Sequence, residues 1–436
     1  MAIAIMQRRL RESPMTAHVV NRSVAERTLA QQFAEQERRE RSPARAAAFA
    51  RFAAVGLPTR RVEAWHYTDL RALMADAAPI LPAPTWADIE AVSSRLAGRA
   101  RLATGAQLVL LGGRFIPELS DPLPTGVSIA EGVAVHAADD PLAALNEALS
   151  PCGYTISIVR GANIAEPITL LHLGDEASSC SVYSRTAIEF GVKAQASFVE
   201  IFEGAHSGVQ RHPATILTLA EGASAKHVAV VGDEPGLHIE TQICELAKGS
   251  ELTAFGLISG GDVTRRQIFL RITGEEAKAS LGGLALIDGA RRADTTLQVV
   301  HAAPSGTSRE FYRTIVDDDA IGVFQGKIIV EKAAQKTDGA MKSQAILLSP
   351  RAQMNGKPEL EIFADDVVCG HGATVASLDP EHIFYLQSRG ISDEDAKGML
   401  LEAFGGEAID RVEDKLLVDA LRARLTAWLA TRKAKM

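Results

Sequence analysis

Residues 277–289 read Ala-Lys-Ala-Ser-Leu-Gly-Gly-Leu-Ala-Leu-Ile-Asp-Gly, and segments of this kind recur along the chain. Each segment opens on a small residue, and successive openings lie 29, 27 and 27 residues apart: Ala194, Ala223, Ser250 and Ala277. Glycines close the same segments at intervals of 28, 28 and 29 residues: Gly204, Gly232, Gly260 and Gly289. A nearly fixed period of about 20 to 50 residues is typical of a solenoid, in which each coil buries its face against the next. The repeat therefore favours a β-solenoid, and ordinary hairpins recurring at this spacing are the alternative.

The residues between these landmarks alternate as strands do. In the run 266–273, Ile268, Leu270 and Ile272 share one face, and Phe269 and Arg271 share the other. Successive side chains of a strand point to opposite faces, so one of these faces is predicted to be buried. Short alternating runs separated by glycines begin near residue 107. We therefore expect a mainly β core over residues 105–378.

The first hundred residues are rich in Ala and Arg and predict helices. Ser42 and Pro43 are residue types preferred at an N-cap and a first helical position, and Gly56 is typical of a helix end. Phe49 and Phe52 lie three residues apart on one face of that helix. Prolines at 79, 82 and 84 then break the pattern and indicate a linker. We expect an N-terminal helical region and linker over residues 1–104.

Helical signals return after residue 378. Asp379-Pro380 opens a helix that Gly390 stops, and Ser392 with Asp395 resembles a capping box that opens a second helix. We expect the second helix to end at residues 405–406, Gly-Gly. The third helix carries apolar residues on one face: Leu417, Leu421, Leu425 and Trp428. We therefore expect a helical region over residues 379–436. The end coils of a solenoid have unpaired backbone groups, and helices at both termini could cover them.

Composition argues against several classes of protein. A net charge of -8 and a pI near 5.8 argue against a nucleic-acid-binding surface, which needs clustered basic charge. The basic residues Arg432, Lys433 and Lys435 suit the negative end of a helix dipole instead. No apolar run reaches the roughly 18 residues of a membrane span, and the apolar start, residues 1–6, is too short for a signal peptide. Four scattered cysteines indicate a reducing cytoplasm.

The stretch Cys369-Gly370-His371-Gly372 has the clearest candidate chemistry. On a strand, residues two apart project from the same face, so the thiol and the imidazole are expected to point together. A closed metal site normally has about four ligands, and the other cysteines, at 152, 180 and 244, lie far upstream. From spacing alone, a structural cysteine beside a satisfied histidine is the alternative. Histidines at 172, 206, 212, 227, 238 and 301 are each expected to be structural or exposed.

Motifs for catalysis by this chain itself are missing. The segment 322–327, Gly-Val-Phe-Gln-Gly-Lys, is too short for a phosphate-binding loop and leads into a strand-like run. Because some β-solenoids cleave polysaccharides, clusters of carboxylates are candidate catalytic groups as well. Residues 317–319 are expected in a solvated turn, and Asp365 and Asp366 in a strand, where neighbours face opposite ways and make no facing acid–base pair. With only 5% aromatic residues to stack sugars, a carbohydrate enzyme is the weaker alternative.

Four stretches resemble the SufB/SufD family of scaffold proteins of the SUF iron–sulfur cluster assembly system. They are Gln325 to Ile328, Met354 to Ile362, Asp365 to Thr374 and Ile383 to Ile391, with a weaker echo at Glu63 to Thr68. The similarity extends from about residue 105 to the C-terminal helices and is most specific over residues 354–391. Within the family, Cys-x-His-Gly-Ala-Thr followed by Phe-Tyr-Leu-x-Ser-Arg-Gly-Ile is similar to the D subunit.

The resemblance implies a right-handed parallel β-helix between helical ends and a non-catalytic scaffold role. It implies a B-type partner paired through the β-helix, and ABC-type ATPase subunits bound to the C-terminal helices. The docking residues implied there are Phe384, Tyr385, Arg389 and Gly390.

The resemblance also assigns the candidate ligands. His371 matches the family's ligand position for a transient iron–sulfur cluster or iron at the subunit interface, and Cys369 is a second candidate. The missing ligands are expected from the partner, and no cofactor is expected to be bound tightly by this chain alone. Gly370 departs from the serine common in relatives but keeps a small residue.

Two further readings stay open within this resemblance. In one, the subunit is purely structural and stabilises its partner without a ligand of its own, and Phe384 and Tyr385 simply pack in a helix. In the other, the isolated chain forms a homodimer when the partner is missing. No nucleic acid or membrane partner is expected.

Overall fold

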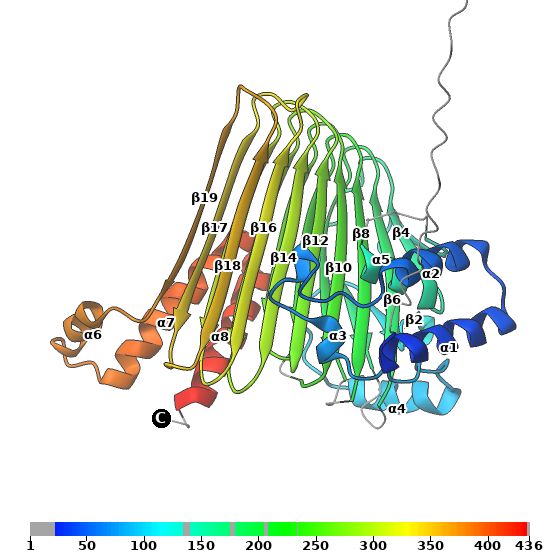
Figure 1. Ribbon diagram of the computed structural model, residues 1–436, viewed down its shortest axis with the longest axis horizontal. Coiled ribbons are helices and arrows are strands. Elements are labelled where there is room, and N and C mark those ends of the chain that lie inside the picture. The colour runs from blue at the N-terminus through cyan, green and yellow to red at the C-terminus, as the bar shows by residue number, and fades with distance from the viewer. Residues whose placement is uncertain (1–21, 134–139, 175–178, 205–207, 233, 434–436) are drawn as a thin grey trace, which may run out of the picture.

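The computed structural model describes residues 22–133, 140–174, 179–204, 208–232 and 234–433. Its centre is a stack of strands in two facing sheets, with helices from both termini around it (Figure 1). The expectations for residues 1–6, His206, Lys435 and the side chain of Lys433 lie outside the described residues.

The two sheets, here called sheet A and sheet B, are built from alternate strands of the chain. Sheet A has nine strands: β3 (Val127–Glu131), β4 (Tyr154–Ile158), β6 (Ser181–Phe190), β8 (Gln210–Leu219), β10 (Leu237–Leu246), β12 (Val263–Ile272), β14 (Arg292–His301), β16 (Ile321–Val330) and β18 (Gln353–Ile362). Sheet B has ten: β1 (Gln107–Leu111), β2 (Arg114–Phe115), β5 (Ile168–Leu173), β7 (Gln195–Glu203), β9 (Ser224–Val231), β11 (Glu251–Ile258), β13 (Lys278–Ile287), β15 (Thr307–Val316), β17 (Asp338–Leu347) and β19 (Val368–Ala376).

From β4 on, each strand pairs in parallel with the strand two places along the chain. In the β12–β14 ladder, for example, Ile268 lies opposite Leu297. Antiparallel pairs occur among the described strands at the first coils, between β1 and β2 and between β3 and β4. Parallel pairing of strands one coil apart confirms the β-solenoid and excludes recurring hairpins. Ile268, Leu270 and Ile272 are buried inside the solenoid, as the alternation predicted.

The repeated small residues form a corner where each coil turns into its sheet B strand. Ala194, Ala223, Ser250 and Ala277 are all 0% exposed, so a larger side chain has no room there. The residue before each has a positive φ: Lys193, Gly222, Gly249 and Glu276. Its backbone N–H donates to a carbonyl of the next coil, at 2.8 Å from Gly249 to Glu275. This column of left-handed residues links successive coils and accounts for the nearly constant period.

The N-terminal helices are α1 (Val24–Arg39), α2 (Pro43–Val55), η1 (Glu63–Trp65), α3 (Leu70–Leu73), α4 (Trp86–Leu96), η2 (Pro117–Leu119) and α5 (Pro141–Leu149). The predicted start and end of α2 are confirmed: the Ser42 hydroxyl accepts a hydrogen bond from the Arg45 N–H, and Gly56 has φ 77°. The proline-containing segment 79–84 is extended, and its Leu81 N–H donates to the Ser181 carbonyl at 2.9 Å.

Residues 62–68 lie across the outer face of sheet A and bond to several strands. The Arg265 guanidinium of β12 lies 3.7 Å from the centre of the Trp65 ring and donates to the Ala64 carbonyl at 2.8 Å. The same carbonyl accepts from Gln325 of β16 at 3.0 Å. Farther along, the Tyr67 carbonyl accepts a hydrogen bond from Arg292 of β14 at 2.8 Å. This cross-strand segment therefore joins the N-terminal helices to three neighbouring coils.

The C-terminal helices are α6 (Pro380–Gln387), α7 (Asp393–Ile409), η3 (Asp410–Val412) and α8 (Lys415–Lys433). The predicted caps of α6 and α7 are confirmed, since the Asp379 and Ser392 side chains accept from the backbone N–H groups of Glu381 and Asp395. The predicted end of the second helix at residues 405–406 is wrong. A Cβ at Gly405 would lie 2.9 Å from a Leu425 methyl group, so these glycines let α8 pack closely against a continuous α7.

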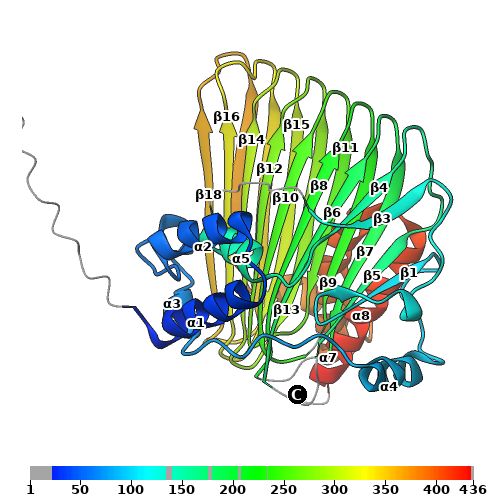
Figure 2. The ribbon, with the colours of Figure 1, turned by 90° about the vertical axis from the view of Figure 1, so that its right-hand side faces the viewer.

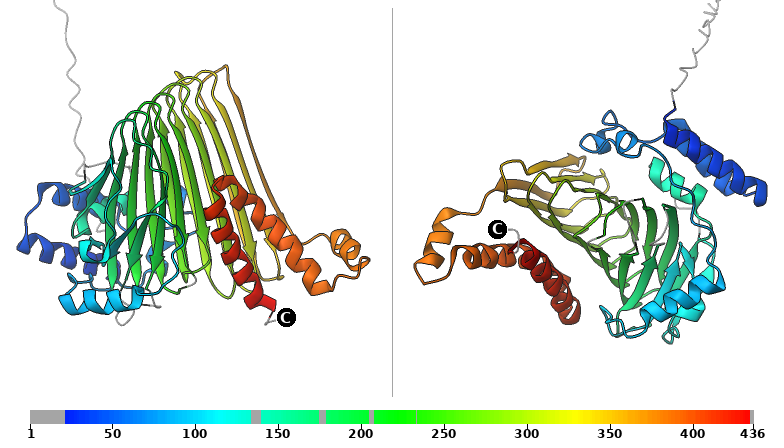
Figure 3. Two further views of the ribbon diagram at one scale, coloured as in Figure 1. Left: turned by 180° about the vertical axis from the view of Figure 1, so that it is seen from behind. Right: turned by 90° about the horizontal axis from the view of Figure 1, so that it is seen from below.

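Most helices from the two ends of the chain cover opposite faces of the solenoid, while α4 packs in the same apolar cluster as α7 and α8 (Figures 2 and 3). Helices α1, α2 and α5 lie on the sheet A side, while α7 and α8 lie on sheet B, with the predicted apolar face of α8 buried: Leu417, Leu421, Leu425 and Trp428. None of the helices in the described ranges combines the length and apolarity needed to cross a lipid bilayer.

Three predictions about charged residues need correction. The sequence predicts that Arg432 complements a helix dipole, but its side chain is buried, lies 3.3 Å from an Asp288 oxygen and also pairs with Asp317. Asp317 does lie in a turn, as predicted, but it is only 7% exposed because α8 covers it. Asp365 and Asp366 lie in the bend between β18 and β19 rather than in a strand.

Candidate metal site at the open end of the solenoid

The last coil of the solenoid is uncovered. Strands β18 and β19 are the outermost strands of their sheets, and β19 is exposed along nearly its whole length (Figure 1). Large apolar side chains at this end face solvent: Phe363 is 63% exposed and Val368 72%. An exposed strand edge with unpaired backbone groups and apolar side chains is a site for pairing with another strand.

Cys369 and His371 lie on β19 at this open end. Cys369 pairs in register with Gly339 of β17, which pairs with Ser308 of β15. His371 continues a second row, through Met341 to Glu310. Because Gly339 and Met341 are buried positions of β17, the register places both candidate ligands on the inner face of the solenoid, as the spacing of two predicted.

The surroundings of the two candidate ligands differ. Cys369 is half-buried and packs against the interior apolar cluster, while His371 is exposed. A Cβ at Gly339 would be 3.5 Å from both the Cys369 Sγ and the Ser308 Oγ, so the glycine leaves space between them. Burial raises the pKa of the Cys369 thiol, as do the carboxylates of Asp338 and Glu310, against a backbone hydrogen bond from Gly339.

Glu310 is an ionisable group inside the solenoid, in the row of His371, that the sequence did not reveal. Its side chain is 1% exposed, and neither carboxylate oxygen has a hydrogen-bond partner among the described residues. Burial raises the pKa of Glu310 to about 8, against smaller opposing effects of Ser308 and Arg309. A neutral carboxylic acid therefore lies two strands behind His371 at neutral pH.

The described residues contain no group of three His, Cys, Asp or Glu side chains that is arranged to hold a metal ion. Cys369 and His371 provide one thiol and one imidazole, fewer than the roughly four ligands of a closed zinc or iron–sulfur site. Completing such a site at this end would require ligands from another chain. Asp365 and Asp366, in the neighbouring bend, are exposed.

A second cluster of ionisable groups is fully enclosed in the first coils. The Glu200 carboxylate lies 3.3 Å from His172 Nε2 and 3.2 Å from His227 Nε2, and it accepts a hydrogen bond from Thr215. Although burial alone raises the pKa of Glu200, the two imidazoles hold it below its usual range. Residues 172, 200 and 227 are spaced by the repeat period, so the sequence alone could have indicated that these three side chains lie together. Because its polar groups are satisfied internally, the cluster is structural.

The candidate docking residues lie on and just after α6, beyond the last strand (Figure 3). Phe384 is 72% exposed and Tyr385 56%. Arg389 lies with its guanidinium 4.9 Å from the Tyr385 ring centre and donates to the phenol oxygen at 3.0 Å. Gly390 has φ 81° and follows the helix end. The two aromatic side chains thus face solvent rather than a helix core.

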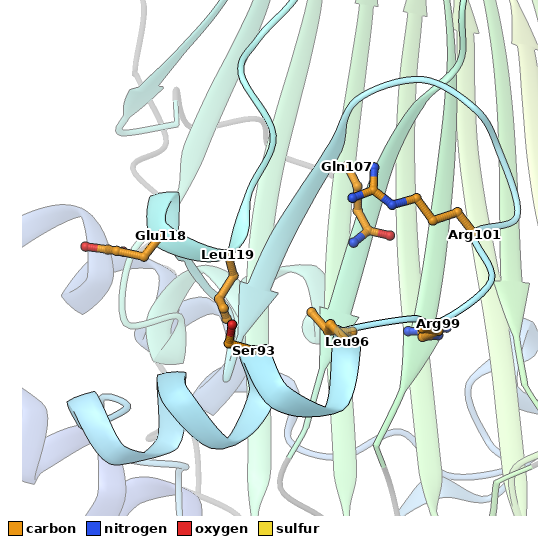
Figure 4. A pocket seen from close by; sticks show the side chains of 7 residues that line it. All are labelled: Ser93, Leu96, Arg99, Arg101, Gln107, Glu118 and Leu119. Carbon is orange, nitrogen blue, oxygen red and sulfur yellow. The ribbon is translucent and has the colours of Figure 1, made fainter.

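The small pocket of Figure 4 offers no comparable chemistry. It has a volume of about 140 Å³ and lies between α4, β1 and η2. Its arginines are already paired with carboxylates, Arg99 with Glu203 and Arg101 with Asp121. Positive charge there is therefore neutralised within the chain.

The chain is similar to known proteins over most of its length. The family described as "SUF system FeS cluster assembly, SufBD core domain" matches residues 172–404. The chain is 30% identical to the iron–sulfur cluster assembly protein SufD of Escherichia coli over 409 residues, covering 90% of this chain and 94% of that protein. It is 28% identical to an iron–sulfur cluster assembly SufBD family protein of Synechocystis, covering 84% and 86%. A chloroplastic protein of Arabidopsis thaliana, ABCI7, is 26% identical over 69% of this chain and 66% of its own length.

Proposed function

Because this chain belongs to the SufBD family of SUF-system iron–sulfur cluster assembly proteins, we propose that it is the D-type, non-catalytic scaffold subunit of such a system. The observation that carries the proposal is the open last coil, where unpaired strand edges lie beside an incomplete ligand set. A scaffold that builds its cargo between two chains needs both features at one place.

The partner in this proposal is a B-type subunit that pairs with β18 and β19. Backbone hydrogen bonds to the two free edges would extend both sheets, and the exposed Phe363 and Val368 would be buried in the contact. In the absence of that partner, a second copy of this chain would meet the same edges. The homodimer is therefore a state of the isolated chain.

The cargo is a nascent iron–sulfur cluster or iron held between the subunits. His371 supplies an imidazole, Cys369 supplies a thiolate after losing its proton, and the partner supplies the remaining ligands. None of the four cysteines forms a disulfide bond, which suits a reducing cytoplasm. No cluster is held tightly by this chain alone, because two ligands do not close a site.

The energy source is an ABC-type ATPase on the C-terminal region, residues 379–436. This chain lacks a phosphate-binding loop, and α6 offers exposed aromatic side chains with Arg389 and Gly390 behind them. Binding of ATP by the docked ATPase would move α6 and change the contact between the two scaffold subunits. The ligands would then be open to iron and sulfide.

Substitution of His371 by Ala tests the ligand role in the purified complex of this chain with its B-type partner and the ATPase. We expect cluster formation, followed by visible absorbance and by iron content, to fall while the subunits stay associated. The matched control is His66→Ala, because His66 is exposed and lies on neither the last coil nor α6. Unchanged iron and absorbance in His371→Ala would leave the purely structural role, in which this subunit only stabilises its partner. Polysaccharide cleavage by the isolated chain would favour the carbohydrate enzyme instead.

A further inference from the structure

Three cations surround the Phe311 ring on the outer face of β15. Phe311 is 5% exposed, and its ring centre lies 4.0 Å from the Arg411 guanidinium, 5.0 Å from that of Arg313 and 5.9 Å from the Lys342 Nζ. Arg411 belongs to η3, directly after α7, whereas Lys342 belongs to β17. The ring is buried beneath cations from both elements, so this cluster joins the C-terminal helices to sheet B.

Arg313 makes the same connection from the strand side. It lies 6% exposed on the outer face of β15, and its guanidinium is 4.2 Å from the ring centre of Phe404 on α7. It also pairs with Glu407, one helical turn farther along α7. Helix α7 is thereby held to β15 by an ion pair and by stacked side chains.

Helix α6 is held very differently. It has no buried residues, and it is tied to β19 by three residues, 377–379, and to α7 by five, 388–392. A displaced α6 therefore has two ways to relax: it drags α7 along, or it pulls on β19. Which one occurs depends on how firmly α7 is fixed.

From this arrangement we propose that the cluster of Phe311, Arg313, Phe404, Glu407 and Arg411 is an anchor that fixes α7 to β15 and so directs movement of α6 into β19. The inference rests on the proposed function, because it takes the docked ATPase as the source of movement. Strand β15 is a suitable fixed point, since it lies two strands, roughly 10 Å, from β19 in sheet B. With α7 held there, displacement of α6 changes the edge strand that carries Cys369 and His371.

The anchor has a second property that suits this role. The inner face of β15 carries Ser308 and Glu310, in the rows that lead through Gly339 and Met341 of β17 to Cys369 and His371. The strand that holds the helix outside is therefore also the strand behind the candidate ligands inside. Movement between β15 and β19 would change the surroundings of Cys369, which makes its reactivity the natural readout.

The experiment uses the full complex with the B-type partner and the ATPase. Phe311→Leu keeps an apolar side chain but removes the ring, and Arg411→Ala removes an exposed cation from the anchor. The matched control is Arg422→Ala, which breaks a pair with Asp410 inside the helical region. Alkylation of Cys369 is followed by mass spectrometry of its peptide, with and without ATP, alongside ATPase stoichiometry and turnover.

We expect ATP to accelerate Cys369 alkylation by about fivefold or more in the wild type and in Arg422→Ala. In Phe311→Leu and Arg411→Ala, ATP should change the rate of Cys369 alkylation by less than about twofold. ATPase binding and turnover should stay at the wild-type level. Acceleration by ATP as large as in the wild type would, in Arg411→Ala, overturn the proposed anchor. If Phe311→Leu disturbs folding, Arg411→Ala alone tests the proposal, because Arg411 is exposed. No acceleration in the wild type itself would refute the ATP-driven opening of the proposed function and the anchor with it.

Discussion

Replacing Glu310 by Gln should change how the stability of this protein depends on pH. Burial raises the pKa of Glu310 from its ordinary value of 4.5 to about 8, so the folded state keeps the carboxyl proton in a range where the unfolded state has lost it. Stability is therefore highest below pH 4.5 as far as this group is concerned, and it decreases as pH rises from 4.5 to 8. The amide that replaces the carboxyl group has no proton to lose in this range, so the Glu310→Gln variant should lack this slope.

The size of the effect follows from the shift. One unit of pKa difference corresponds to about 1.4 kcal/mol, so the wild type should lose about 2.5 kcal/mol between pH 5 and pH 7 through this group alone. Urea unfolding of wild type and Glu310→Gln at pH 5, 6, 7 and 8 measures the difference between their slopes, in which the other titrating groups cancel. Glu245→Gln, on an exposed position of β10, is the matched control. Parallel profiles for wild type and Glu310→Gln would refute the reasoning, because they would mean that the buried carboxyl group is already ionised.

Three further predictions concern the corner, a buried imidazole and the open end. Glu276→Gly should raise the free energy of unfolding by about 1 kcal/mol, because Glu276 has φ 60°, and Gly249→Ala should lower it by a similar amount; urea titration measures both. Burial lowers the pKa of His301 to about 4, so its unfolded state binds a proton first as pH falls from 6.5, and stability decreases down to about pH 4. A His301→Gln variant with an unchanged acid slope would contradict this. Phe363→Asp should prevent pairing at the last coil, whether with the B-type partner or with a second copy, without lowering the melting temperature; light scattering of mixtures tests it.

The sequence predicted the solenoid because corners impose residue size at a fixed interval. Ala194, Ala223 and Ala277 had to be small wherever the coil turns, and this left a period that could be read directly. The shared face of Cys369 and His371 was predictable for the same reason, since strand geometry fixes it.

Contacts between coils and helices were harder to foresee. The glycines at 405 and 406 resemble a helix end in the sequence, but they are glycines because α8 packs closely against them. That contact is tertiary and leaves no local sequence signal. Glu310 gave no signal, because its burial depends on side chains that other strands bring around it. His172, Glu200 and His227 were within reach, since they follow the period that identified the fold.

The cross-strand segment, residues 62–68, has a consequence for how this molecule unfolds. A stack of coils with contacts only between neighbours would lose its coils one at a time from an uncovered end. Bonds from Ala64 and Tyr67 to β12, β14 and β16, with the Glu63–Lys357 pair reaching β18, tie four coils to one peptide. Fraying at the open end is thereby confined largely to β19 and its pairing with β17, while the coils behind exchange their amide hydrogens only in a shared, more costly opening. The molecule thus combines a pliable last strand, free to accept another chain, with a body that opens as a single cooperative unit.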